Sequence, residues 1–348
     1  MPSGVDEILL KLLEAYSPTG HEDEARDVIV EICEDLGLKV EVDDVGNVLA
    51  SKGGGGRVWL VGHYDTVPGR LPVKRSGDVI AGRGAVDAKG PLSAMIMAAY
   101  LSKSPVTLAA LVGEEGDSKG ARHLLTRELP PFVVIGEPSN TDGVIVAYRG
   151  GAHLTLRCRA EGGHSSSPGV SAVDLLIESI LRMKEAAPGG RYDDPSVAIT
   201  VIRGGEAHNV LPKKASAVLD LRVPPGTDLL SLIDDIVRRL PVGCELEVGW
   251  TVPPVSVRPN DPVPRALTRS ILSLGGKPRL LRKYGSSDMN ILYSGVESIA
   301  AYGPGDGKLA HTDEEFVRVE DLELAVNVYV RTVEYLNSRG PIRASQPH

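Results

Sequence analysis

Three short apolar segments share one design, and this repetition limits the fold more than any other feature of the chain. Residues 58–62, 108–113 and 132–136 each end in glycine, and His63, Glu114–Glu115 or Glu137 follows directly. An apolar run of this length is typical of a strand buried on both faces of a mainly parallel sheet. A fourth run, residues 299–304, leads towards His311. The pattern predicts an α/β domain with polar side chains at the carboxyl ends of its strands.

Helical periodicity marks the segments around these runs. Val5, Ile8, Leu9, Leu12 and Leu13 follow the spacing of a buried stripe and predict the first helix. Further helices are expected over about 22–36, from just after Asp87 to about Leu101, and over about 320–337, where apolar residues again fall on one stripe.

Residues 151–256 have a different pattern, in which strands and helices alternate as βαββαβ. This order fits a ferredoxin-like sandwich. We therefore expect an inserted domain at 151–256 within a domain formed by 1–150 and 257–348. The expected elements are a strand at 152–159, a helix at 170–186, strands at 196–202 and 215–222, a helix at 228–240 and a strand at 243–250.

The charge and cysteine content exclude several classes of protein. A formal net charge of -8 argues against an extended nucleic-acid surface. No apolar run reaches the length of a membrane span, and the first residues do not resemble a signal peptide. Cys33, Cys158 and Cys244 are odd in number and far apart in sequence, so neither a disulfide scaffold nor a cysteine-based zinc site is expected. We expect a cytoplasmic enzyme.

Six residues are candidate metal ligands because of where they occur. A lone histidine or strand-end acid is usually structural, so the argument depends on their repetition. Carboxylates gathered in one place repel one another unless cations neutralise them. Imidazoles combined with carboxylates suit zinc-like ions, whereas magnesium prefers oxygen ligands alone. The candidates are His63, Asp87, Glu114, Glu115, Glu137 and His311.

At five places the sequence resembles the M20 family of dinuclear metallohydrolases, which contains amino-acid deacetylases, desuccinylases and carboxypeptidases. The resemblance implies a zinc-peptidase-like catalytic domain, formed by 1–150 and 257–348, with an inserted lid domain that dimerises. The matching segments occur in family order and are residues 62–68, 82–90, 113–116, 136–139 and 311–314.

The resemblance also implies a role for each candidate residue. Asp87 would bridge two divalent metal ions, zinc or alternatively cobalt. His63 and Glu137 would complete one site, and Glu115 and His311 the other. Glu114 would be the general base of amide hydrolysis rather than a ligand. Asp65 would orient the imidazole of His63.

Residues 162–166, Gly-Gly-His-Ser-Ser, resemble the segment that carries the lid histidine of the family. In the family this histidine reaches the active site of a partner subunit and helps to bind the oxyanion. The resemblance assigns that role to His164 and implies a homodimer formed through the lid domain. The alternative is an ordinary histidine in a surface turn.

Substrate-binding residues are also implied by resemblance. Asn209 and Arg222 match an asparagine and an arginine of the family, and the planar guanidinium of Arg222 suits a carboxylate. The alternative is that Arg222 simply pairs with Asp220. Ser286 and Ser287 lie in a Gly-Ser-Ser-Asp segment that resembles the site-lining Gly-Thr-Ser-Asp loop, with Ser286 in place of the usual threonine.

Details around 64–69, 87–92, 287–290 and 311–316 most resemble one branch, the amino-group-carrier-protein–lysine/ornithine hydrolases. That branch releases lysine or ornithine from the γ-carboxyl of the C-terminal glutamate of a small acidic carrier protein, in lysine and arginine biosynthesis. Independently, residues 262–287 contain six basic residues and no acid. This basic island could steer an acidic partner, or it could be a solvated helix face.

Other functions remain open at this point. Within the family, the alternatives are a deacylase for acetylornithine or succinyl-diaminopimelate, and a dipeptidase or carboxypeptidase. An inactive metal- or peptide-binding protein is disfavoured, because binding needs Glu115 but not the adjacent Glu114. A plain α/β cofactor-binding protein is disfavoured because no Gly-x-Gly-x-x-Gly follows the first apolar strand.

Overall fold

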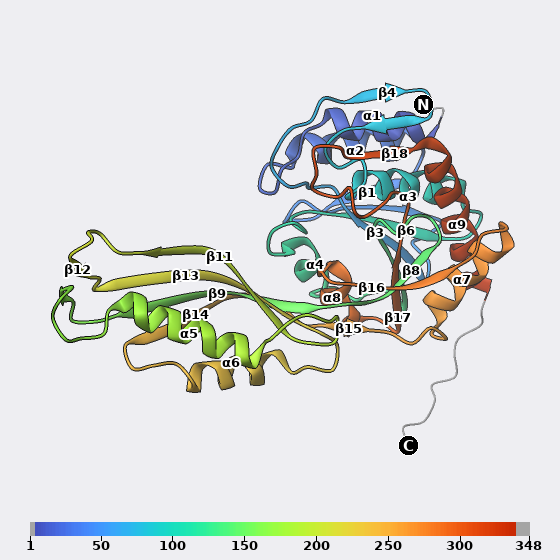
Figure 1. Cartoon of the computed structure of the whole chain (residues 1–348). Coiled ribbons are helices and arrows are strands. Elements are labelled where there is room, and N and C mark those ends of the chain that lie inside the picture. Colours follow the sequence, from blue (N-terminus) through green and yellow to red (C-terminus); the bar gives the residue numbers. More distant parts are fainter. Residues whose placement is uncertain (1–3, 339–348) are drawn as a thin grey trace, which may run out of the picture. The chain divides into compact units, whose positions relative to one another are not determined.

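The computed structural model describes residues 4–338, which form two compact units (Figure 1). Unit 1 contains the described residues up to Val146, Val257–Arg282 and those from Ser287 onwards. Unit 2 contains Ala147–Ser256 and Lys283–Ser286. Among residues 4–338, no helix is long and apolar enough to cross a membrane.

Unit 1 is built around a large mixed sheet. Its central strands β6, β3, β7 and β17 are parallel neighbours, whereas β2 and β8 flank them antiparallel. The four apolar runs form these central strands, and side chains such as Leu60 and Val134 are fully buried. The strand order is β1 (Lys39–Val42), β2 (Val48–Lys52), β6 (Val106–Leu111), β3 (Val58–His63), β7 (Phe132–Gly136), β17 (Ser298–Tyr302), β8 (Gly143–Tyr148) and β15 (Val255–Ser256), with β16 (Arg279–Lys283) also paired to β8.

Helices of unit 1 pack around this sheet. Helix α3 packs on β3 and β6 and is buried along nearly all its length, as its apolar composition on every face requires. Helix α9 packs on both α3 and α7. The helices are α1 (Val5–Glu14), α2 (Asp23–Asp35), α3 (Lys89–Leu101), α4 (Lys119–Leu124), α7 (Pro262–Ser273), α8 (Asp288–Leu292), a short 3-10 turn (Tyr293–Gly295) and α9 (Val319–Ser338).

A small antiparallel sheet of unit 1 brings two distant segments together. Strand β5 (Val79–Ala81) lies between β4 (Lys74–Ser76) and β18 (Phe316–Arg318). Phe316 is paired with Ala81 in this register. The loop that follows Ala81 and contains Asp87 is therefore anchored beside the segment that contains His311.

Unit 2 contains an antiparallel sheet in the order β11-β13-β9-β14. Strand β13 alternates between buried and more exposed residues, and its buried side joins the helices in one apolar core. Each element begins and ends within two residues of the sequence expectation. The elements are β9 (Gly150–Arg159), α5 (Ala172–Ala186), β11 (Ser196–Gly204), β13 (Lys214–Val223), α6 (Leu229–Arg238) and β14 (Cys244–Val252), with a two-stranded ribbon of β10 (Gly163–His164) and β12 (Val210–Leu211).

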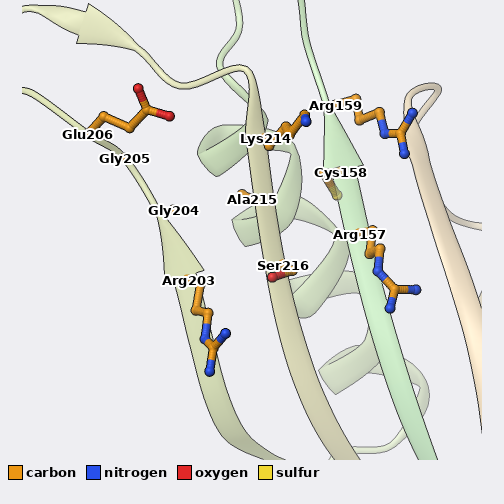
Figure 2. Close-up of a pocket in the computed structure, with 10 residues that line it drawn as sticks. All are labelled: Arg157, Cys158, Arg159, Arg203, Gly204, Gly205, Glu206, Lys214, Ala215 and Ser216. Atoms are coloured by element: carbon orange, nitrogen blue, oxygen red, sulfur yellow. The ribbon is translucent and has the colours of Figure 1, made fainter.

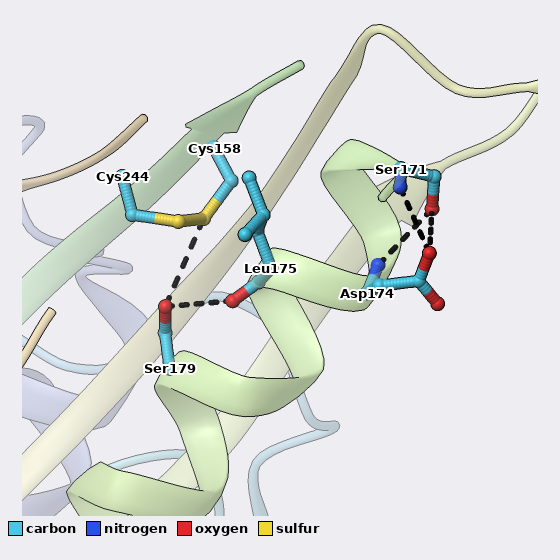
Figure 3. Close-up of a disulfide and its surroundings, with 6 residues drawn as sticks. All are labelled: Cys158, Ser171, Asp174, Leu175, Ser179 and Cys244. Carbon is cyan, nitrogen blue, oxygen red and sulfur yellow. Dashed lines mark hydrogen bonds between the residues drawn. A yellow bond between two sulfur atoms is a disulfide. The ribbon is translucent and has the colours of Figure 1, made fainter. Parts of the chain in front are cut away.

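The sequence offered no reason to expect a disulfide, since the three cysteines do not suggest a disulfide scaffold, but the structure contains one. Cys158 and Cys244 are bonded to each other (Figure 3). They are 86 residues apart in sequence, but they lie directly opposite each other on β9 and β14. The bond is on the buried side of the sheet, where Ser179 of α5 lies next to the Cys158 sulfur. Cys33 is free and buried, and burial raises its pKa to about 12.

Candidate metal centre

The five ligand residues expected from the sequence come together in unit 1. His63 is the last residue of β3, Glu137 directly follows β7, and Glu115 lies four residues beyond β6. Asp87 stands just before α3, and His311 lies in the loop between β17 and β18. The three strand-end residues meet because β6, β3 and β7 are parallel neighbours, so their carboxyl ends lie at one edge of the sheet.

These five residues form two groups that share Asp87. His63, Asp87 and Glu137 make one group, and Asp87, Glu115 and His311 make the other, with ligand atoms of each group within 4.8 Å of one another. The two Asp87 oxygens divide between the groups. Oδ1 lies 3.3 Å from His63 Nε2, and Oδ2 lies 3.3 Å from His311 Nε2. The His311 Nε2 is also 2.8 Å from Glu115 Oε1.

The electrostatics of the cluster are those of a site that attracts cations. Hydrogen bonds to Asp87 and Glu115 raise the pKa of His311 to about 10. Burial opposes the positive charge of His63, but Asp65 and Asp87 outweigh it and raise the pKa of this imidazole. Burial also opposes the charge of Asp87, but the two imidazoles hold its pKa below the ordinary range. The carboxylates of the cluster thus favour positive charge at both imidazoles.

The donor set fits a pair of divalent metal ions. Each group supplies imidazole nitrogen and carboxylate oxygen, and each has three protein donors, as catalytic zinc sites have. Asp87 presents one oxygen to each group, which is how a bridging carboxylate is placed. His63 Nδ1 is 3.0 Å from the Asp65 backbone oxygen and 3.3 Å from its Oδ1. This contact leaves Nε2 facing the site.

Asp65 also fixes the two adjacent glutamates. Its Oδ1 accepts a hydrogen bond of 3.0 Å from the Glu114 amide, and its Oδ2 accepts one of 3.1 Å from the Glu115 amide. The Thr19 hydroxyl donates to Oδ2 at 2.8 Å. Burial opposes the charge of Asp65, but its hydrogen bonds with His63 and Thr19 hold its pKa below the ordinary value. Asp65 therefore holds both the ligand histidine and the glutamate pair.

Glu114 lies within the cluster but belongs to neither ligand group. Enclosure by protein raises the pKa of its carboxyl well above the ordinary value, and the nearby carboxylates of Glu137, Asp288 and Glu115 add to this effect, while His63 opposes it. A carboxyl with a raised pKa can take up and release a proton near neutral pH.

Sequence reasoning missed Asp288, the first residue of α8. Its side chain is buried, and no hydrogen bond to its Oδ1 is found within residues 4–338. Burial raises its pKa to about 7. The Gly-Ser-Ser-Asp motif could have pointed to it, because an acid at the end of a site-lining loop is a candidate site residue.

A second missed feature is a buried brace between Arg83 and Glu315. The Glu315 Oε1 accepts hydrogen bonds from the amides of Gly84 (3.1 Å), Val86 (2.9 Å) and Asp87 (3.0 Å). Its Oε2 lies 3.1 Å from Arg83 Nη1. The same guanidinium donates to the Thr312 carbonyl at 2.8 Å. The brace therefore ties the Asp87 loop to the segment that carries His311.

The hydrogen bonds found for His164 and Asn209, the substrate-site candidates of unit 2, are to residues of unit 2 and not to the ligand cluster. His164 and Asn209 are both exposed. The Nδ1 of His164 is 2.8 Å from the Ser166 hydroxyl, which lies within the same turn. The Asn209 backbone carbonyl accepts a 3.0 Å hydrogen bond from the Ser165 amide, so the two segments are joined at the β10–β12 ribbon.

The remaining substrate-binding candidates divide between the units. In unit 2, Arg222 Nε donates to Asp220 Oδ2 at 3.0 Å, and its Nη1 donates to the Ser286 hydroxyl at 3.2 Å. Ser287 belongs to unit 1 and is buried. Its hydroxyl accepts a 3.2 Å hydrogen bond from the Met289 amide, so it caps the N-terminus of α8.

The α/β fold of unit 1 carries a cluster of imidazole and carboxylate donors suited to divalent metal ions, and comparison with known proteins shows the family. The sequence profile of peptidase family M20/M25/M40 matches residues 59–335. The chain belongs to this family and is a hydrolase. It is 37% identical over 339 residues to the LysW-lysine/LysW-ornithine hydrolase of Sulfurisphaera tokodaii, covering 95% of each chain. A Pyrobaculum aerophilum relative that carries the same name provisionally is 41% identical over 344 residues, covering 95% of this chain and 97% of its own.

Solved structures of more distant proteins share the fold. The aminopeptidase PepT of Bacillus cereus aligns over 95% of this chain and 98% of its own, with a TM-score of 0.81 and 21% identity. An M20 family metallo-carboxypeptidase of Sulfolobus solfataricus, Sso-CP2, aligns over 97% of this chain and 100% of its own, with a TM-score of 0.79 and 18% identity. At these identities the likeness concerns the fold alone.

Proposed function

We propose that this chain hydrolyses the amide that links lysine or ornithine to the carrier protein LysW, and so releases the free amino acid in lysine and arginine biosynthesis. The observation that carries the proposal is the 37–41% identity, over 94–95% of the chain, to relatives named for this reaction. The clustered metal ligands and Glu114 supply the chemistry that an amide hydrolase needs. The proposal places the protein in the cytoplasm, where biosynthetic intermediates are processed.

The proposal includes two divalent ions, with zinc favoured by the mixed nitrogen and oxygen donors and cobalt as the alternative. His63, Asp87 and Glu137 would hold one ion, and Asp87, Glu115 and His311 the other. Bound ions of this kind supply Lewis acidity and a more acidic water molecule. Asp65 keeps both His63 and the Glu114–Glu115 pair in place, so the ligands need little rearrangement.

In this proposal Glu114 moves the proton. Its carboxylate accepts a proton from the attacking water, the water oxygen bonds to the amide carbon, and the carbon–nitrogen bond then breaks. Glu114 returns the proton to the departing amine nitrogen. The raised pKa of Glu114 supports this role, because the group must hold the proton between the two steps.

We assign to unit 2 the part of a ferredoxin-like lid and dimerisation domain, within the range 151–256, and to unit 1 that of the catalytic domain. The strand order β11-β13-β9-β14 supports the ferredoxin-like assignment. His164 would help to bind the oxyanion across a dimer, and Asn209, Arg222, Ser286 and Ser287 would bind substrate. The edge strand β11 and helix α5 have exposed apolar side chains that a second copy could cover, among them Ile177, Leu181, Ile199 and Ile202.

The test is a hydrolysis assay with purified, zinc-loaded protein. Carrier-linked lysine and carrier-linked ornithine are compared with acetylornithine, succinyl-diaminopimelate and a dipeptide. The proposal expects turnover of at least one carrier-linked substrate and little turnover of the others. Efficient hydrolysis of a small acylated amino acid without carrier-linked activity would instead make the protein a small-molecule deacylase.

A further inference from the structure

One end of the unit 2 sheet has a hollow of about 310 Å³ whose charged lining is four basic side chains and one acidic side chain (Figure 2). Its polar lining residues come from strands β9, β11 and β13 and from the turn after β11. These residues are Arg157, Arg159, Arg203, Glu206, Lys214 and Ser216.

The strand register explains why these side chains share one face. Lys214 is directly opposite Arg159, and Ser216 is directly opposite both Arg157 and Arg203. Residues paired in this way project to the same side of a sheet. The residues between them point the other way, towards α5 and α6, as the burial of Cys158 and Ala215 confirms. The hollow therefore lies on the face of the sheet that the helices of unit 2 leave uncovered.

The charges around this hollow are poorly compensated. Arg157 pairs with Glu247 on β14. Within residues 4–338, no ion pair or side-chain hydrogen bond is found for Arg159, Arg203 or Lys214, and all three are exposed. Like charges directly opposite each other, as in Lys214 and Arg159, destabilise a sheet. We call this cavity the basic hollow, after the exposed side chains of Arg159, Arg203 and Lys214.

The residues of the basic hollow flank, in the chain, the segments of unit 2 that are expected to meet substrate. Arg159 ends β9 five residues before His164, and Asn209 lies between Arg203 and Lys214 in the chain. The Ala160 amide donates to the Lys213 carbonyl at 3.0 Å and joins the two segments beside the hollow. A substrate held at His164 and Asn209 would have the rest of its bulk near this end of the sheet.

We propose that the basic hollow docks a carboxylate-rich surface of the carrier protein. This inference rests on the proposed function and specifies where the protein part of the substrate binds. Uncompensated guanidinium and ammonium groups recognise carboxylates. Exposed charges of this kind mainly speed encounter and select partners, and salt weakens their effect.

The basic island of residues 262–287 is less suited to this role. The Arg279 guanidinium makes two hydrogen bonds, of 2.7 and 2.8 Å, to the Asp142 carboxylate. The Arg269 guanidinium stacks 4.7 Å from the centre of the Tyr335 ring. The island also crosses the boundary between the units, because Lys283 belongs to unit 2. Its charges are thus partly committed to partners within the chain.

The experiment compares charge reversal at the two surfaces. The hollow variant carries Arg159→Glu, Arg203→Glu and Lys214→Glu, and a milder variant carries Gln at the same positions. The island variant carries Arg265→Glu and Lys277→Glu, and Arg238→Glu on α6 controls for a charge change elsewhere in unit 2. Each is assayed with carrier-linked lysine and with a small γ-glutamyl-lysine isopeptide, at low and high salt.

We expect the hollow variant to raise KM for carrier-linked lysine by roughly tenfold or more at low salt, with a smaller rise in the Gln variant. The kcat and the isopeptide kinetics should stay near wild type, and the KM difference should shrink at high salt. The island and Arg238→Glu variants should behave like wild type.

Three results would overturn this assignment. An unchanged KM in both hollow variants would show that the carrier does not dock there, and a rise in the island variant alone would move docking to the island. Tighter binding of labelled single-stranded DNA than of the carrier, lost in the hollow variant, would identify a nucleic-acid site. Absence of carrier-linked turnover by wild type, in contrast, would refute the proposed function itself. If the Glu variant misfolds and loses isopeptide activity, the KM of the Gln variant for carrier-linked lysine decides whether the carrier docks at the hollow.

Discussion

The candidate metal centre of unit 1 and the exposed end of the unit 2 sheet differ in how their polar side chains are held. In unit 1, Asp65 and Glu315 bond backbone amides of the loops that carry the ligands, and both are buried. In unit 2, the His164 side chain hydrogen-bonds to Ser166 of its own turn, and Arg159 and Lys214 face solvent. The first region is organised by its own fold, whereas the second has side chains free to meet another molecule. Substitutions in the two regions should therefore fail in different ways.

The largest expected effect is the loss of turnover in the Glu114→Gln variant, which changes a residue of unit 1. The change keeps the shape of the side chain and removes its ability to take a proton. We expect kcat to fall by about 10²–10⁴, because positioned general bases contribute that much. Two bound metal equivalents, measured by plasma mass spectrometry, should remain, because Glu114 belongs to neither ligand group. Activity within tenfold of wild type would exclude Glu114 as the base.

His164→Ala tests whether an exposed residue of unit 2 acts only in an assembly. We expect kcat to fall by about 10²–10³, the effect of removing one oxyanion donor. Folding and metal content should not change, because the exposed His164 side chain hydrogen-bonds within its own turn, to Ser166. Mixed dimers of His164→Ala and Glu114→Gln subunits should regain activity, since one site then has both residues. If verified mixed dimers do not regain activity, His164 acts in the active site of its own subunit.

The Cys158–Cys244 bond should affect stability in unit 2 and leave the metal centre untouched. Closing a loop of 86 residues restricts the unfolded chain, and native disulfides contribute roughly 2–4 kcal/mol. We expect the Cys158→Ala/Cys244→Ala variant to unfold at lower guanidinium concentration, with metal content unchanged. Reductant should lower wild-type stability to the level of the variant.

Thiol counting provides the control for this prediction. Unreduced, denatured wild type should have one reactive thiol, Cys33, and reduction should increase the count to three. Three thiols before reduction would contradict the bond. The result also bears on location, because disulfides are rare in cytosolic proteins, with those of hyperthermophilic archaea as the main exception.

The sequence predicted most reliably what depends on local patterns. The apolar runs became β3, β6, β7 and β17 because their side chains are buried on both faces, and the residues after them met at one sheet edge. The stripe that begins at Leu322 marked α9 for the same reason, since its apolar residues pack on α3. Helix and strand bounds in unit 2 followed directly from periodicity.

What the sequence could not predict depends on register and distant contacts. The disulfide requires that Cys158 and Cys244 be opposite each other, which the pairing of β9 and β14 decides. The apolar runs pair in parallel, as in the mainly parallel sheet that they predicted, but the runs did not indicate the antiparallel strands β2 and β8 that flank them. Asp288 and Glu315 gained importance only through burial and through contacts with residues far away in sequence.

The smallest effect we predict concerns the Glu315 brace, and it shows how unit 1 organises its ligands. Glu315→Gln keeps an acceptor oxygen but removes the charge that faces Arg83 and three amides. Residues that support metal ligands typically contribute 10–100-fold to affinity. The group of Asp87, Glu115 and His311 should weaken more than the other, because the brace holds the segments of two of its three ligands. Calorimetric metal titration should therefore show one step shifted further than the other.

Glu314→Gln is the matched control for that variant, since Glu314 is adjacent, carries the same charge and is exposed. Its metal titration should match wild type in both steps. A general loss of stability would lower the unfolding temperature of metal-free Glu315→Gln and leave its metal affinities unchanged. That outcome would make the brace merely structural. A loss of metal affinity at one step, with metal-free stability close to that of Glu314→Gln, would instead mean that Glu315 positions Asp87 and His311. The loop before α3 and the loop before β18 would then together hold one of the two metal ions.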